Sequence, residues 1–240
     1  MYTTVKLLDY SIFNCSLDDI IYSDKCIINT VNQYSYTIAE RDEEFKAALC
    51  NADILLPDGI GIVAAVKFLS QCTIKRITGS DLHEFLLKKI NLDSGSCFYL
   101  GSDNKTLHKI KNKLAREFPN IKVNFFAPPY KESFSEAENE EIIQMINFHQ
   151  PDVLFLGMTA PKQEKWSYKN KEKLNAGAIC SIGAVFDFYA ENISRPSKFW
   201  RDRGLEWFIR LLKEPIRMFK RYVYYGPVFV FSVLLKKVID

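Results

Sequence analysis

The stretch Ile54–Val63, ILLPDGIGIV, joins an apolar run to a helical pattern through a short turn. The uncharged, branched residues before Pro57 predict a buried strand, and the residues from Ile60 onward predict a helix. Between the two elements Asp58 follows a proline and precedes a glycine. A carboxylate on a short, rigid turn at a strand end is well placed for acid–base chemistry. The alternative is that Asp58 only caps the helix.

Five other apolar runs of this kind alternate with helical patterns along the chain. The predicted strands lie in KCIINTVN (25–32), DILLPDG (53–59), SCFYLGS (96–102), IKVNFFAPP (121–129), DVLFLGM (152–158) and AGAICSIGAVFD (176–187). Helical spacing with solvent-facing charges occurs at 36–52, 80–90, 105–118, 136–149 and 161–174. This alternation predicts an α/β fold, a parallel sheet with helices on both faces, whose ligands bind beyond the carboxyl ends of the strands. The first 25 residues give no clear prediction.

Composition limits the classes of protein that fit. The 240 residues are 48% hydrophobic and 25% charged, as in an ordinary soluble globular protein. The start, MYTTVKLLDY, has no basic region followed by an apolar one, so we expect a cytoplasmic protein. Six scattered cysteines without a C-x-x-C pair argue against a zinc site and against a disulfide framework. Three histidines (His83, His108, His149) share no spacing, and we expect them at the surface rather than as metal ligands.

Charge divides the chain near residues 194–197. Residues 195–240 contain eleven Lys or Arg and four Asp or Glu, whereas residues 1–194 contain 21 and 25. We therefore predict a core at 1–194 and a basic appendage at 195–240. Such an appendage favours a polyanionic partner, either a nucleic acid or an anionic membrane surface.

The appendage has the pattern of an interfacial amphipathic helix. Apolar residues alternate there with Arg210, Lys213, Arg217, Lys220 and Arg221. The following apolar run, 222–235, has fourteen residues and contains Gly226 and Pro227, which we expect to break it. It is shorter than the roughly 20 residues that span a bilayer, so we expect it to lie on the membrane. The alternative is a helix pair packed on the core; nucleic-acid binding is disfavoured because the aromatic residues follow helical spacing.

Two further motifs lie where predicted strands meet helices. LGSDNKT (100–106) places Gly101 and Ser102 before a helix, where free amides suit a phosphate, unless Ser102 or Asp103 is only the N-cap. GMTAPKQEKW (157–166) places Pro161 at a helix start and Gln163 in its first turn. The chain has neither G-x-G-x-x-G nor a P-loop, which argues against dinucleotide binding. It also has no D-x-D pair, which disfavours a transferase that holds a nucleotide diphosphate through a carboxylate-bound metal.

Six motifs together resemble one family. They are NTVN (29–32), LPDGIGIV (56–63), RITGSDL (76–82), GMTAPKQEKW (157–166), GAVFDFYAENISRP (183–196) and GLEWFIRLLKEPIRMFKRY (204–222). Their order and approximate spacing are similar to those of the WecG/TagA/CpsF glycosyltransferases, from about Ile27 to about Tyr222. The resemblance implies a Rossmann-like core and an inverting transfer without metal or cofactor. The sugar, of the N-acetylmannosamine type, passes from a UDP donor to a polyprenyl-diphosphate-linked acceptor at the cytoplasmic membrane face, in the synthesis of cell-surface polysaccharide or teichoic acid.

The resemblance also implies roles for individual residues. Asp58 is the expected general base, Thr30 and Asn32 line the same pocket, and Arg76 and Gln163 complete it. Expected substrate contacts are Gln163, Gly101, Ser102, Gly183 and Asp187 in the core, with Asp187 at the nucleoside, and Arg210, Arg217 and either Lys220 or Arg221 in the appendage. Expected partners are the donor, the acceptor, an anionic membrane and, through the core, further copies of the chain, but no nucleic acid.

Two other functions compete with this one. The chain fits a membrane-surface or nucleic-acid binding module on the same scaffold without transferase activity. An enzyme that modifies nucleotide sugars, such as an epimerase or dehydrogenase, fits less well, because the sequence has no nicotinamide fingerprint and no Tyr/Lys or Cys pair.

Overall fold

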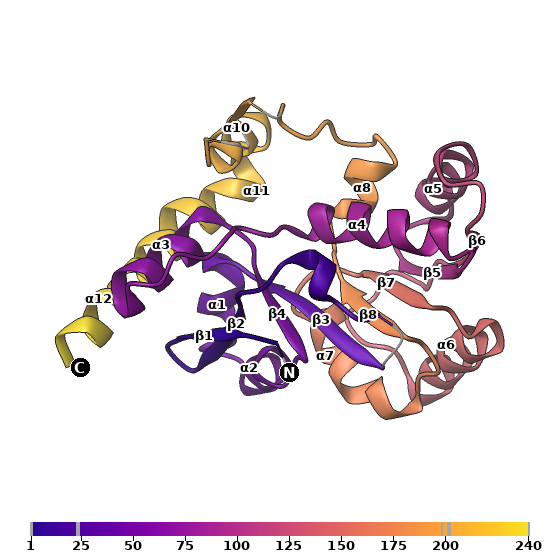
Figure 1. Cartoon of the computed structure of the whole chain (residues 1–240), viewed down its shortest axis with the longest axis horizontal. Coiled ribbons are helices and arrows are strands. Elements are labelled where there is room, and N and C mark those ends of the chain that lie inside the picture. The colour runs from indigo at the N-terminus through magenta and orange to yellow at the C-terminus, as the bar shows by residue number, and fades with distance from the viewer. Residues whose placement is uncertain (1, 23–24, 198, 201–202, 240) are drawn as a thin grey trace.

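The computed structural model describes residues 2–22, 25–197, 199–200 and 203–239, apart from the side chains of Arg217 and Ile239. Its centre is a parallel sheet of six strands: β3 (Cys26–Val31), β4 (Ile54–Pro57), β5 (Ser96–Gly101), β6 (Lys122–Phe126), β7 (Val153–Gly157) and β8 (Ala178–Ser181). Their order is β4-β3-β8-β7-β5-β6 (Figure 1). Each strand lies within one predicted apolar run, so the expected α/β class is confirmed.

Helices cover both faces of this sheet (Figure 1). One face packs against α4 (Gly79–Leu92), α5 (Asn104–Glu117) and α8 (Val185–Tyr189). The other packs against α6 (Glu136–His149) and α7 (Lys162–Asn170), which continues into a 3₁₀ turn, η2 (Lys171–Lys173). Because both faces are covered, the central strands β7 and β8 are almost entirely apolar and buried rather than alternating, as is usual in parallel sheets.

The N-terminal residues form a small unit beside the β4 edge. An antiparallel hairpin, β1 (Thr4–Leu7) and β2 (Tyr10–Phe13), precedes a short 3₁₀ helix, η1 (Leu17–Asp19). Three helices complete this side of the molecule: α1 (Gln33–Ala39), α2 (Glu43–Cys50) and α3 (Ile60–Ser70). The hairpin shares an apolar cluster with all three.

The C-terminal helices follow, and the last of them packs on this unit. They are α10 (Glu206–Lys213), α11 (Pro215–Phe219), a π-helical segment η3 (Lys220–Tyr224) and α12 (Tyr225–Ile239). In Figure 1, α12 runs along α3, and it also contacts α1. Phe229 is 2% exposed, and its ring centroid lies 5.1 Å from that of Tyr36. One face of α12 therefore packs on the core, as in the alternative given above for the basic appendage.

The opposite face of α12 is apolar and exposed. The exposed fraction is 61% for Phe231 and 84% for Val238. The expected break at Gly226 and Pro227 is wrong, because both lie within α12, which directly continues the π-helical segment η3. None of the described helices combines the length and the apolar composition that a membrane span requires.

Three other local predictions differ from the structure. The predicted helix 36–52 is two helices, α1 and α2. Asp42 is the N-cap of the second helix, because its side chain accepts a hydrogen bond from the amide of Phe45. The predicted strand 176–187 ends at Ser181, so Asp187 lies on α8. His83 is not a surface residue: its Nε2 lies 2.7 Å from the hydroxyl of Tyr99 inside the core, where burial lowers the pKa of the imidazole to about 3.

Candidate active site

Two parallel neighbours, β3 and β4, bring the first candidate residues together. In their register Thr30 pairs with Leu56 and Val31 with Pro57, so the residues that follow each strand meet at one edge. The amide of Asp58 donates a hydrogen bond of 2.9 Å to the carbonyl of Val31. Asp58 is thus fixed to the end of β3 as well as to β4, and its side chain is half-buried.

The side chain of Asn32 both caps α1 and lines a cavity at this edge. As the N-cap of α1, its Oδ1 accepts hydrogen bonds from the amides of Tyr34 and Ser35, at 3.1 and 3.0 Å. Its side chain also lines the cavity that Asp58 lines. The capping bonds hold the carboxamide in place, so the Nδ2 group is oriented without help from a ligand.

The glycines after Asp58 accommodate a protein side chain. Gly59 has φ +123°, and a Cβ on Gly61 would meet Nε2 of Gln33 at 2.0 Å. The carboxamide of Gln33 therefore packs across the start of α3 in the space that these glycines leave.

Arg76 reaches the same cavity from the segment before α4. The amide of Ile77 donates a 3.0 Å hydrogen bond to the carbonyl of Pro57, which holds this segment against the end of β4. The side chain of Arg76 is 22% exposed. The family resemblance placed Asp58, Thr30, Asn32, Arg76 and Gln163 in one pocket. The first four line one cavity of about 310 Å³, and Gln163 does not.

The C-terminal segment closes the other side of this cavity. It contributes Arg195 from the residues after α8, Glu206 and Arg210 from α10, and Arg221 and Tyr222 from η3. The Nη2 of Arg195 donates a 3.2 Å hydrogen bond to the hydroxyl of Thr78, the N-cap of α4. Of the two alternatives for one basic position, Arg221 lines the cavity, whereas Lys220 lies near the ring of Tyr225.

The cavity has an uneven set of charges. Among the residues that the structure describes, its lining has four guanidinium groups (Arg76, Arg195, Arg210, Arg221) and two carboxylates, those of Asp58 and Glu206. Burial is the largest cause that raises the pKa of Asp58 to about 6, and the carboxylate of Glu206 adds to it. Arg76, Arg210 and Arg195 act in the opposite direction. A carboxyl group with a pKa near 6 accepts a proton more readily than one of ordinary pKa, which suits a general base.

A second, larger cavity of about 1640 Å³ lies at the carboxyl ends of β5 and β7. Gly101, Ser102 and Asp187 line it, as does Thr159. Gly101 has φ +121°, and a Cβ there would lie 2.6 Å from the carbonyl oxygen of Gly157, so the turn requires glycine. Asp103, not Ser102, is the N-cap of α5.

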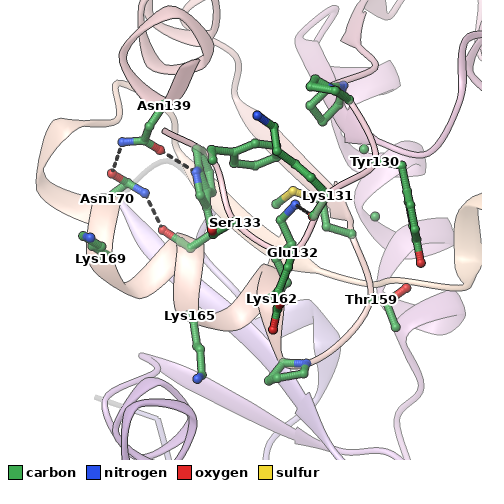
Figure 2. A pocket seen from close by; sticks show the side chains of 18 of the residues that line it. Tyr130, Lys131, Glu132, Ser133, Asn139, Thr159, Lys162, Lys165, Lys169 and Asn170 are labelled. Carbon is green, nitrogen blue, oxygen red and sulfur yellow. Dashed lines mark hydrogen bonds between the residues drawn. The ribbon is translucent and has the colours of Figure 1, made fainter. Parts of the chain in front are cut away.

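Figure 2 shows the outer wall of this second cavity, formed by the loop before α6 and by α7. The Nζ of Lys162 donates a 2.6 Å hydrogen bond to the carbonyl of Lys131 and lies 3.7 Å from the ring centroid of Phe134. Asn139 joins the Nε1 of Trp166 to the carboxamide of Asn170. These bonds fix the wall, and the Lys162 ammonium adds a positive charge to it.

Two predicted residues line neither cavity. Gln163 is 4% exposed, and its Nε2 donates a 2.9 Å hydrogen bond to Oε1 of Glu164. Gly183, with φ +51°, lies beside the Gln163 carboxamide. For Arg217, the side chain is outside the part of the chain that the structure describes.

Sequence reasoning missed Arg195 and Glu206 as cavity residues. Both lie inside quoted motifs, GAVFDFYAENISRP and GLEWFIRLLKEPIRMFKRY, but only their proximity in space distinguishes them from other charged residues of the basic appendage. Tyr34 and Thr78 were also missed, because a residue in the first turn or at the N-cap of a helix has no local signal of facing a cavity.

A comparison with known protein families gives a match over nearly the whole chain. The model of the Glycosyl transferase WecG/TagA/CpsF family matches residues 3–240. The chain belongs to this family.

Three curated relatives of this WecG/TagA/CpsF family chain share the name N-acetylglucosaminyldiphosphoundecaprenol N-acetyl-beta-D-mannosaminyltransferase. The protein of that name from Bacillus spizizenii (strain ATCC 23059 / NRRL B-14472 / W23) is 29% identical over 179 residues, which cover 75% of this chain and 68% of the relative. The one from Bacillus subtilis (strain 168) is 27% identical over 191 residues, covering 80% and 73%. The one from Staphylococcus aureus (strain MW2) is 26% identical over 192 residues, covering 80% and 74%.

Proposed function

We propose that the protein is an inverting glycosyltransferase that moves an N-acetylmannosamine-type sugar from a UDP donor to a polyprenyl-diphosphate-linked sugar. The observation that supports this most is Asp58, a carboxylate of raised pKa at a strand end, in a cavity lined by four guanidinium groups. The names of the relatives, which specify an N-acetylmannosaminyl group and an N-acetylglucosaminyl diphosphoundecaprenol acceptor, support the choice of substrates.

In this mechanism Asp58 takes the proton from the attacking hydroxyl of the acceptor. The hydroxyl oxygen forms a bond to the anomeric carbon of the donor, and the bond from that carbon to the diphosphate oxygen breaks. UDP leaves with the electron pair. Because attack comes from the face opposite the leaving group, the anomeric configuration inverts.

We assign the donor diphosphate and the acceptor diphosphate to the two cavities from the positive groups that line each of them. The donor nucleotide occupies the larger cavity, with its diphosphate near Gly101 and Ser102 at the start of α5 and its nucleoside near Asp187. The acceptor diphosphate occupies the smaller cavity, where Arg210 and Arg221 lie on the C-terminal segment. Positive side chains and helix N-termini then replace the metal that other transferases use for the leaving group.

We also propose that residues 195–240 act as an appendage that holds the enzyme on an anionic membrane. The outer side of the C-terminal helices exposes Leu212, Ile216, Phe219, Phe231, Leu235 and Val238, and Lys213, Lys236 and Lys237 accompany them. Such a mixture of exposed apolar and basic side chains is typical of a helix that lies in the membrane interface.

The test is an assay of UDP release against a panel of UDP-sugars, with an N-acetylglucosaminyl diphosphate on a short polyprenyl chain as acceptor. Acceptor-dependent UDP release, with mass spectrometry of a product one sugar larger, is the expected result. A protein that binds anionic vesicles but releases no UDP with any donor would favour a binding module without transferase activity.

A further inference from the structure

Glu206 is a carboxylate that the C-terminal segment places among the guanidinium groups of the smaller cavity. It is the first residue of α10, and its side chain is 13% exposed. Its Oε2 lies 3.7 Å from Nη1 of Arg76, and its Oε1 lies 3.5 Å from Nε of Arg195. One carboxylate therefore lies between an arginine of the core and one that follows α8.

Both distances are longer than those in a hydrogen-bonded ion pair. Charge-assisted hydrogen bonds between arginine and carboxylate are about 2.7–2.9 Å long. The Oε2 of Glu206 is buried and has no hydrogen-bond partner among the described residues. Arg195 meanwhile bonds to Thr78, so this guanidinium is oriented from two sides.

We propose that Glu206 is a positioning residue of the transfer reaction, which orients Arg76 and Arg195 and presents a second negative charge to Asp58. This rests on the proposed function, in which Asp58 is the base. Because Glu206 belongs to the C-terminal segment, its negative charge faces Asp58 only while that segment covers the cavity.

The charges that face Asp58 come from several elements, and they oppose one another. Glu206 and Arg210 come from α10, Arg76 from the segment before α4, and Arg195 from the residues after α8. The phenol of Tyr222 in η3 is also close enough to interact with it. Burial and Glu206 raise the pKa of Asp58 to about 6 against the three arginines. Without Glu206 only burial opposes the arginines, and Asp58 becomes a weaker base.

The test compares Glu206→Gln and Glu206→Asp with wild type in the full chain. Asp58 must be ionised to accept a proton, so kcat/KM rises with pH and reaches half its plateau at the pKa of Asp58. We expect the midpoint near pH 6 in wild type and roughly one unit lower in Glu206→Gln, since a neighbouring charge shifts a carboxyl pKa by about that much. The plateau of kcat/KM should fall roughly 3- to 10-fold. Glu206→Asp keeps the charge and should restore the wild-type midpoint.

A direct titration separates this proposal from the proposed function. The pKa of Asp58, measured by NMR on protein with ¹³C-labelled aspartate and assigned with Asp58→Asn, should fall in Glu206→Gln whether or not the chosen substrates are correct. Glu84→Gln, an exposed change on α4, serves as the matched control and should leave both the titration and the pH profile unchanged. Lower activity in Glu206→Gln with an unchanged Asp58 titration would overturn the proposal and leave the proposed function intact. Near-normal turnover in Asp58→Asn would instead remove Asp58 as the base, whereas no UDP release from wild type with any donor would overturn the proposed function.

Discussion

The guanidinium of Arg221 lies over the ring of Tyr34, with Cζ 4.4 Å from the ring centroid. Tyr34 is the second residue of α1, the helix that Asn32 caps, and Arg221 belongs to η3. Both side chains line the smaller cavity. A cation–π contact therefore joins the C-terminal segment to the helix that begins at the end of β3.

From this contact we predict that Tyr34→Ala raises the KM for the lipid-linked acceptor. Loss of the ring leaves Arg221 less well oriented, and a cation–π contact of about 0.5–1 kcal/mol corresponds to a roughly 2- to 5-fold change. Tyr34→Phe keeps the ring and should behave as wild type. An equal rise in KM for both variants would show that the ring face does not hold Arg221.

For the catalytic base we predict that Asp58→Asn lowers transfer roughly 10²-fold or more, the range for a positioned acid or base. The amide has nearly the shape of the carboxylate, so folding and UDP binding should persist, as measured by circular dichroism and calorimetry.

Asp58→Asn should also change the thermal stability of the protein, and the size of the change depends on pH. The pKa of Asp58 is raised in the folded protein to about 6, above its usual value near 3.9, so folding favours the neutral form. The stability that this preference contributes is fully present below about pH 4 and is lost as pH rises through about 6. Asp58→Asn should therefore have a higher Tm than wild type at pH 8 and a similar Tm at pH 3.5. A lower Tm at pH 8 would contradict this.

Removal of divalent metals should leave activity unchanged. The proposed diphosphate contacts are backbone amides and arginines, and the sequence has no D-x-D pair. We expect the same rate of UDP release with and without EDTA. Strict dependence on Mg²⁺ or Mn²⁺ would count against this arrangement.

Substitutions of two phenylalanines on α12 distinguish membrane binding by this helix from its packing on the core. Phe231 is exposed, so Phe231→Ser should weaken binding to anionic vesicles, measured by sedimentation, with little change in Tm. Phe229 is buried against Tyr36, so Phe229→Ala should lower the free energy of unfolding by about 3–5 kcal/mol. Unchanged vesicle binding in Phe231→Ser would argue against the outer face of α12 as the membrane contact.

A chain that ends near Ser194 should lose both vesicle binding and transfer. It also loses Phe229 and Val233 from the apolar cluster that contains Tyr36, so we expect a lower Tm for its core. Transfer to the lipid-linked acceptor at the full rate by this shortened chain would contradict the proposed role of residues 195–240.

The sequence by itself predicted the six strands and most of the helices. Their apolar periodicity is a local property, and each strand buried on both faces forms one continuous apolar run, as in DVLFLGM (152–158). It also placed Thr30, Asn32 and Asp58 together, because parallel strands end at the same edge of a sheet and polar residues directly follow β3 and β4.

Only the tertiary structure decided which residues from distant segments meet at that edge. Glu206 and Arg195 have the same local pattern as other charged residues of the basic segment, and Lys220 and Arg221 are neighbours in sequence, yet Arg221 lines the cavity and Lys220 does not. The apolar pattern of α12 does not reveal that Phe229 faces α1 and Phe231 faces outward. Local propensity fixes where a helix begins and ends, whereas the charges and surfaces that it meets depend on long-range packing, which no short window of sequence contains.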